Sequence, residues 1–252
     1  MKSSQQLVIT FVLSTLVLVA IVSINILFES KIHLVTGEGS FLSDLGIILW
    51  CVPATVCFFA AALLRNNQQQ KVCQFLVYSA FLTAYLLFDD FFELHEHYFP
   101  KYLNIDEKII YIILGIATAI LVIRFRQIIL RTNYIVMLMA LGFLAISVAA
   151  DGIFKPMEIV YGVLALVVGS SFYLVVLHPS ILKEYLSVVF MIIVGLCAAF
   201  AVLQTNAEYS EYIFEDGAKW LGIASWCSYY TYTAYQLVVN SYANEAKQKL
   251  AI

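Results

Sequence analysis

The segregation of charge along this chain constrains its fold more than any other feature. Long uncharged apolar runs alternate with short intervals that carry nearly all of the Asp, Glu, Lys and Arg residues. A soluble core of this size would need charged and polar residues along every element to cover its surface. Sixty-two percent of the 252 residues are hydrophobic and 12% are charged, whereas soluble domains are roughly half apolar and a quarter charged. The pattern is typical of helices that cross a lipid bilayer.

The lengths of the apolar runs also fit membrane-crossing helices. A hydrocarbon core about 30 Å thick needs about 20 residues at about 1.5 Å rise, and about 17 to 25 are tolerated. We therefore predict an all-α fold, a polytopic transmembrane bundle of about eight spans, in a single integral membrane domain over residues 1–252. The expected spans are residues 7–28, 45–64, 72–92, 109–125, 132–150, 159–178, 185–204 and 218–240. The fourth is the shortest uncharged run, so Lys108 and Arg124 are expected to snorkel at its ends.

The positions of the charged residues predict the orientation of these spans. With the N-terminus inside, the cytoplasmic segments carry nine Lys and Arg residues and the outer segments five. The positive-inside rule therefore places both termini in the cytoplasm. Every acidic residue except Glu184 and Glu245 then falls on the outer side. Any chemistry is expected at that outer face.

Residues 88–100 form the most informative segment. If the third span continues as a helix past Phe88, three- and four-residue spacing gathers five ionisable side chains on one face. Pro100 is expected to end this helix, because the residue before a proline avoids the helical region. The five side chains on the shared face are Asp89, Asp90, Glu93, Glu96 and His97.

So many acidic groups on one face repel each other unless positive charge lies among them. A metal ion, a lysine or shared protons could supply it. An oxygen-rich set with one imidazole suits a divalent Ca, Mn, Fe or Zn ion. The alternatives are a hydrated helix end among the lipid headgroups and a carboxylate network that carries protons. The predicted metal ligands are Asp89, Asp90, Glu93, His97 and Asp151, the last of which ends the fifth span.

The last predicted span opens with acids and then continues as a polar stripe. Acids at a helix N-terminus complement its dipole, and Lys219 can pair with Glu215 one turn away. A stripe of polar and aromatic side chains gains nothing from facing lipid, so it should line the bundle interior. Its members are Glu215, Lys219, Gly222, Trp226, Tyr229, Thr233, Gln236 and Asn240. A second stripe, expected to lead inward from Asp89, consists of Gln74, Tyr78 and Tyr85.

Two motifs in these segments carry a family resemblance. Asp89-Asp90 with His95-Glu96 has the form DDxxxxHE, and Glu215-Asp216-Gly217 with Lys219 and Gly222 has the form EDGxKxxG. Together they resemble uncharacterised multi-pass bacterial membrane proteins. This resemblance implies a protein of the bacterial inner membrane and implies no activity.

The histidine pattern differs from that of a second membrane family. The alkaline-ceramidase-like superfamily consists of seven-span zinc hydrolases with a His-x-x-x-His pair near the end of the chain. Here no histidine follows His178, and this departure argues against that family.

Three functions fit the sequence. In a metal-dependent hydrolase or transferase acting on a lipid-type substrate, the cation would activate water or polarise the substrate. Glu96 or Glu215 would then serve as the base, and Lys219 would stabilise developing negative charge. The same carboxylates could instead serve a proton- or cation-coupled transporter or channel. The third possibility is an accessory subunit of a membrane complex. The expected partners are membrane lipids and a lipid or ion substrate, and no nucleic acid.

Overall fold

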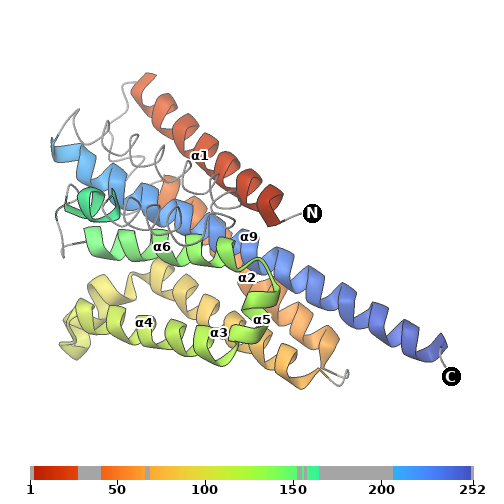
Figure 1. Cartoon of the computed structure of the whole chain (residues 1–252). Helices are drawn as coiled ribbons and strands as arrows, with labels where there is room; N and C mark the ends of the chain where they lie inside the picture. The colour runs from red at the N-terminus through yellow and green to blue at the C-terminus, as the bar shows by residue number, and fades with distance from the viewer. Residues whose placement is uncertain are drawn as a thin grey trace, which may run out of the picture.

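The computed structural model describes residues 3–27, 41–65, 69–151, 155, 158–164 and 207–250. Within these ranges every regular element is helical, which confirms the all-α prediction. Figure 1 shows how the helices lie. The elements are α1 (Ser3–Leu27), α2 (Phe41–Leu64), α3 (Gln70–Phe92), the π-helix η2 (Leu94–Leu103), α4 (Glu107–Arg124), α5 (Arg126–Arg131), α6 (Tyr134–Ala150) and α9 (Ala207–Leu250).

The long helix α9 organises the packing. It contacts α6, α2 and α1, and its C-terminal end extends beyond the other helices (Figure 1). Helix α3 packs against α2, and α4 runs beside α3 on the side of the molecule away from α1. The chain therefore folds as a bundle in which the helix latest in the sequence contacts three earlier ones.

The buried face of α9 is aromatic. Trp226, Tyr229 and Tyr230 have 1% or less of their surface exposed. Trp226 meets Trp50 of α2 edge to face, with ring centroids 6.0 Å apart, an arrangement that aromatic quadrupoles favour. The prediction that this face lines the interior is confirmed for Trp226, Tyr229 and Thr233. It is wrong for Asn240, which is exposed.

The prediction of about eight spans is wrong. In the described part of the chain, only α2 over Asp44–Leu64 and α3 over Gln70–Phe92 are long and apolar enough to cross a membrane, judged by length and composition. Helix α6 is apolar but has only 17 residues. Helix α4 has 18 residues and carries Glu107, Lys108 and Arg124 among them. For these two helices the apolar run in the sequence overstated the fit, because α6 is short and α4 carries charges at both ends.

Part of that prediction lies outside the described residues. The expected span at 185–204 is not described, and the span at 159–178 is described only as far as residue 164. The expected span at 218–240 lies within α9, which has 44 residues and therefore begins and ends well beyond the predicted limits.

The prediction for the inner face of α3 is also wrong. Gln74 and Tyr85 are exposed, whereas Ser79 and Thr83 are fully buried. Tyr78 donates a hydrogen bond to the Ala117 carbonyl oxygen of α4, 3.2 Å away. The prediction relied on the polar hydroxyl of tyrosine. The buried positions hold serine and threonine instead, whose small side chains allow the close approach that helix packing favours.

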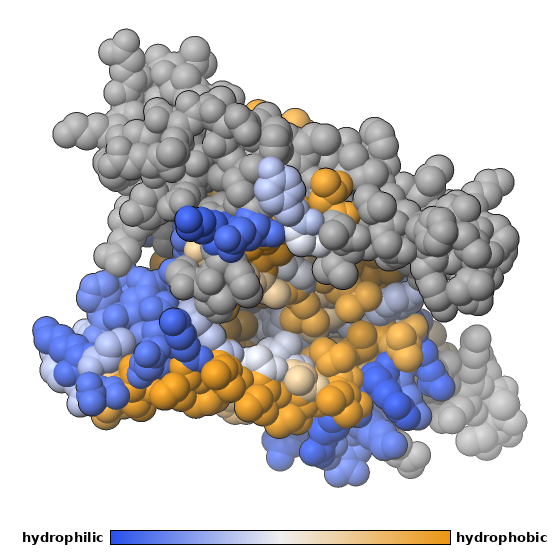
Figure 2. Space-filling view, turned by 60° about the vertical axis from the view of Figure 1, so that its left-hand side comes forward, coloured by the Kyte–Doolittle hydropathy of each residue, from blue (hydrophilic) through white to orange (hydrophobic). Residues whose placement is uncertain are grey.

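Apolar side chains also cover an outer face of the molecule. Figure 2 shows a band of hydrophobic surface with hydrophilic surface at both of its ends. Much of the exposed apolar area on α4 comes from isoleucines that recur at three- and four-residue intervals and are each about half exposed or more: Ile109, Ile112, Ile113, Ile116, Ile120 and Ile123.

Gly222 allows α9 to approach α6, which gives a test of the packing. A Cβ added there would lie 2.8 Å from Leu144 Cγ and 3.0 Å from the Leu144 backbone nitrogen, so one helix must shift. We expect Gly222→Ala to destabilise the fold by about 1–3 kcal/mol, the usual cost of overpacking, despite the better helix propensity of alanine. Thermal unfolding in detergent, followed by circular dichroism, measures the change.

Gly115 of α4 provides the matched control. A Cβ there meets nothing within 4 Å, so Gly115→Ala should raise stability by about 1 kcal/mol, the propensity difference between the two residues. Equal effects of the two substitutions would contradict the close approach of α9 to α6.

Candidate functional site

The site begins where the backbone departs from the α-helix. Helix α3 ends at Phe92, and Glu93 adopts a left-handed conformation with φ of 50°, which non-glycine residues rarely adopt. The chain then continues as the π-helix η2 with Pro100 inside it. The prediction that Pro100 ends the helix is therefore wrong. Short π-helical segments frequently occur at functional sites.

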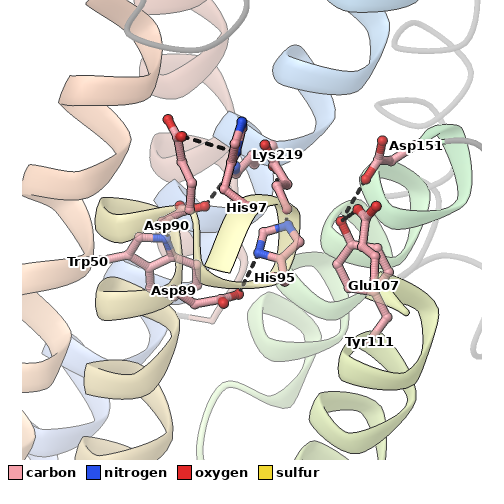
Figure 3. A network of polar contacts seen from close by, with 11 residues as sticks. Trp50, Asp89, Asp90, His95, His97, Glu107, Tyr111, Asp151 and Lys219 are labelled. Carbon is pink, nitrogen blue, oxygen red and sulfur yellow. Dashed lines mark hydrogen bonds and ion pairs between the residues drawn. The ribbon is translucent and has the colours of Figure 1, made fainter. Parts of the chain in front are cut away.

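This turn separates the acids that the sequence placed on one helical face. Because the helix changes register at Glu93, Asp89 and Asp90 point from the end of α3 while Glu96 and His97 project from η2. Figure 3 shows the resulting arrangement, in which residues from α2, η2, α4, α9 and the end of α6 surround the acids. The prediction that these acids share one helical face is therefore wrong, but the acids still gather in one region.

Lys219 supplies positive charge to this region. Its Nζ lies 2.7 Å from Asp90 Oδ1, and the Trp50 indole donates to Asp90 Oδ2 across 2.8 Å. Asp90 thus joins α2, α3 and α9 through one carboxylate (Figure 3). The predicted pairing of Lys219 with Glu215 is replaced by this pair, although the two residues still interact electrostatically.

His95 lies between two carboxylates. Its Nδ1 is 2.9 Å from Asp89 Oδ2 and its Nε2 is 3.3 Å from Glu96 Oε1. Both His95 and Asp89 are buried, with 6% and 4% of their surface exposed. Burial alone lowers the pKa of His95, but the contacts with Asp89 and Glu96 outweigh it and raise that pKa to about 10. His95 is therefore an imidazolium at neutral pH, a second fixed positive charge.

Tyr111 of α4 joins two further acids. Its hydroxyl lies 2.8 Å from Glu107 Oε1 and 2.6 Å from Asp151 Oδ2. Its ring centroid is 5.1 Å from that of His95, so this triad adjoins the histidine. Burial and the two carboxyl neighbours raise the pKa of Tyr111, which keeps its hydroxyl protonated. Burial and then Asp151 raise the pKa of Glu107, although the Tyr111 hydrogen bond opposes the rise.

Glu215 completes the group from the N-terminal half of α9. Burial raises its pKa to about 8, and the negative charges of Asp151, Asp216 and Glu96 contribute while Lys219 opposes them. Glu215 is therefore largely protonated at neutral pH. We call this group of side chains the acidic cluster. Its carboxyl groups belong to Asp89, Asp90, Glu93, Glu96, Glu107, Asp151 and Glu215, and its cations are Lys219 and His95.

The predicted metal ligands have different partners. Asp89 contacts His95, Asp90 contacts Lys219, and Asp151 contacts Tyr111. Glu93 and His97 lie 3.3 Å apart at the exposed edge of the cluster. Across the described ranges, no three His, Cys, Asp or Glu side chains have the geometry to hold one metal ion.

The sequence did not identify His95, Glu107, Tyr111 and Trp50 as site residues. Glu107 and Tyr111 stand four residues apart on one helix, so this pair could have been found from its spacing. The role of His95 depends on the register change at Glu93. That of Trp50 depends on tertiary packing between α2 and α3, and no local signal indicates it.

The fold and site define a protein that is helical throughout its described part, with an ion-paired acidic cluster at one end of its helices. The family model described as Domain of unknown function (DUF8692) matches residues 7–162, and the chain belongs to this family. The match covers the cluster as far as Asp151 and ends before α9. No curated protein and no solved structure matches the chain.

The raised pKa of Glu215 predicts a pH-dependent effect on stability. The folded state binds the Glu215 proton up to about pH 8, whereas the unfolded chain releases it near the ordinary value of 4.5. Its contribution is therefore most favourable at low pH and is lost as pH rises through about 8. We expect Glu215→Gln to unfold at a higher temperature than wild type at pH 9, with a smaller difference at pH 5.

Glu158→Gln is the matched control for the Glu215 experiment, because Glu158 is exposed. It should shift the unfolding temperature little at either pH. A Glu215→Gln protein that loses stability at pH 9 would contradict the assignment of a protonated, buried carboxyl to this position.

Proposed function

We propose that this chain is a membrane protein whose acidic cluster binds and releases protons, and that it acts in proton-coupled transport. One observation carries the proposal: the Tyr111 hydroxyl contacts carboxyl oxygens of both Glu107 and Asp151. A phenol has one hydrogen and can donate it to one acceptor. The second contact is favourable only if the other carboxyl has its own proton and donates to the Tyr111 oxygen. The contacts of Tyr111 with Glu107 and Asp151 thus favour a proton stored on one of these two carboxyls.

The charge balance of the acidic cluster supports the same proposal. Its carboxyl groups outnumber Lys219 and His95, and like charges that share a site raise one another's pKa. The pKa of Glu215, raised to about 8, means that a proton supplies part of the missing positive charge at neutral pH, and the pKa of Glu107 is shifted in the same direction. Protons that are held near neutral pH can be exchanged by modest changes in the surroundings, as proton-coupled transport requires.

The membrane part of the proposal is supported by the surface of α2 and α3. Ile48, Phe59, Phe81 and Phe88 are each more than half exposed, and contiguous apolar surface on a soluble monomer is uncommon. A bilayer crossed by these two helices would cover such side chains. The acidic cluster would then lie at one membrane face, just past the end of α3.

The orientation follows from the opposite end of the same helices. Arg65 directly follows α2 and Lys71 lies in the first turn of α3, so both lie at the end of these two helices away from the cluster. Arg126 and Arg131 of α5 lie at this basic end as well. The positive-inside rule places the basic end in the cytoplasm and the acidic cluster at the outer face of the cytoplasmic membrane.

A flux measurement tests the proposal. The full chain is reconstituted in liposomes that contain a pH-sensitive dye, and a potassium gradient with valinomycin drives proton uptake. Wild type should acidify the lumen faster than protein-free liposomes. We expect Asp151→Asn to slow uptake about tenfold or more, because a positioned acid or base typically contributes 10²- to 10⁴-fold to a proton transfer.

Glu158→Asn, at an exposed position, is the control and should leave uptake unchanged. Uptake by wild type that equals that of empty liposomes would refute the proposal. In that event, stoichiometric Ca, Mn, Fe or Zn lost in Glu93→Gln would favour the metal-dependent hydrolase or transferase. Stable co-purification of one partner would favour the accessory subunit.

A further inference from the structure

Helices α3 and α9 run antiparallel with polar side chains facing each other at matching intervals. Asp90 pairs with Lys219 at the acidic cluster. Seven residues deeper on both helices, Trp226 Nε1 donates to Thr83 Oγ1 across 3.0 Å. Four residues deeper again, Ser79 of α3 neighbours Tyr230 of α9, although their hydroxyls do not have the geometry of a hydrogen bond. These side-chain pairs thus continue the register of the Asp90–Lys219 ion pair along the buried contact between α3 and α9.

The row of hydroxyls continues past Tyr230 toward the start of α6. The neighbouring Tyr229 hydroxyl lies 3.0 Å from Thr132 Oγ1. Thr233, one turn further along α9, lies near Tyr229 without a hydrogen bond to it. Together these side chains extend from α3 through α9 to the connection between α5 and α6. We name this set the hydroxyl row; its members are Thr83, Ser79, Tyr230, Tyr229, Thr233 and Thr132.

Three oxygens in this row lack hydrogen bonds. Ser79 Oγ, Tyr230 OH and Thr233 Oγ1 are buried and have no hydrogen-bond partner among the residues that the structure describes. All three residues are 0% exposed. Buried polar groups in native proteins nearly always have a partner, from the protein or from ordered water. Three such oxygens in one row of side chains therefore indicate a ligand that they share, rather than three unrelated hydroxyls that each lack a partner.

We propose that the hydroxyl row binds ordered water and forms the inner half of a proton route that leads to the acidic cluster. Water suits the row because it can donate to and accept from hydroxyls, as each of these side chains does. The proposal that the water carries protons rests on the proposed function of the cluster. The binding of water does not.

Proton movement along such a row leaves every atom balanced. Each hydroxyl or water passes one hydrogen to the next oxygen and receives one from the oxygen before it, so no group is oxidised or left charged at the end. Between the row and the cluster, the seam is apolar at Leu87 and Ile223. Trp50 spans this layer, with its indole nitrogen on Asp90 and its ring beside Trp226. The layer is therefore the barrier at which the two halves of the route meet.

Radiolytic footprinting of the full chain tests the water site directly. Hydroxyl radicals generated from water label buried tyrosines only where water is bound beside them. We expect Tyr230 to be labelled to a similar extent as Tyr235, which is 65% exposed. Met137, a reactive side chain that is 1% exposed, should remain unlabelled and reports that the fold is intact. An unlabelled Tyr230 would overturn the proposal.

The flux assay then tests the route. Tyr230→Phe removes only the hydroxyl, and we expect it to slow proton uptake about tenfold, while Tyr235→Phe on the outer side of the same helix matches wild type. If Tyr230→Phe does not fold, Ser79→Ala replaces it. Wild-type uptake that survives in the variant would overturn the route. A labelled Tyr230 with no wild-type uptake would refute the proposed function and leave the water site standing.

Discussion

The contact between Lys219 and Asp90 is the interaction on which the rest of the structure depends. It joins the end of α3 to a helix more than a hundred residues later and fixes the antiparallel register between them. A partly buried ion pair contributes little net stability compared with apolar packing, but a wrong register would leave Asp90 buried and unpaired. The pair therefore selects one alignment. The contact of Trp226 with Thr83 and the nearness of Tyr230 to Ser79 follow from that alignment.

The same pair explains why protons suit the acidic cluster. Lys219 and His95 neutralise two of the carboxylates and are held there by 2.7 and 2.9 Å contacts. The acids beyond these pairs, Glu107 and Glu215 among them, lie where burial and like charge raise their pKa values. The acidic cluster therefore combines two cations held by ion pairs with acids whose pKa values are raised.

Local sequence signals predicted most of the helices and few of their contacts. Apolar runs predicted α1 to α4 and α6 within a few residues, because each run ends at charged or turn-forming residues. The number of membrane-crossing helices could not be read in this way, since it depends on where each helix ends. The acidic residues of the site were found because their clustering is local. The left-handed turn at Glu93 was missed because nothing in its neighbours requires it.

Infrared spectroscopy of the purified protein detects protons held on the acidic cluster, because a protonated carboxyl has a C=O stretching band that an ionised carboxylate lacks. We expect such a band at neutral pH, loss of the Glu215 contribution as pH rises above about 8, and a weaker band in Glu215→Gln. A wild-type spectrum at neutral pH in which every carboxyl is ionised would contradict this expectation.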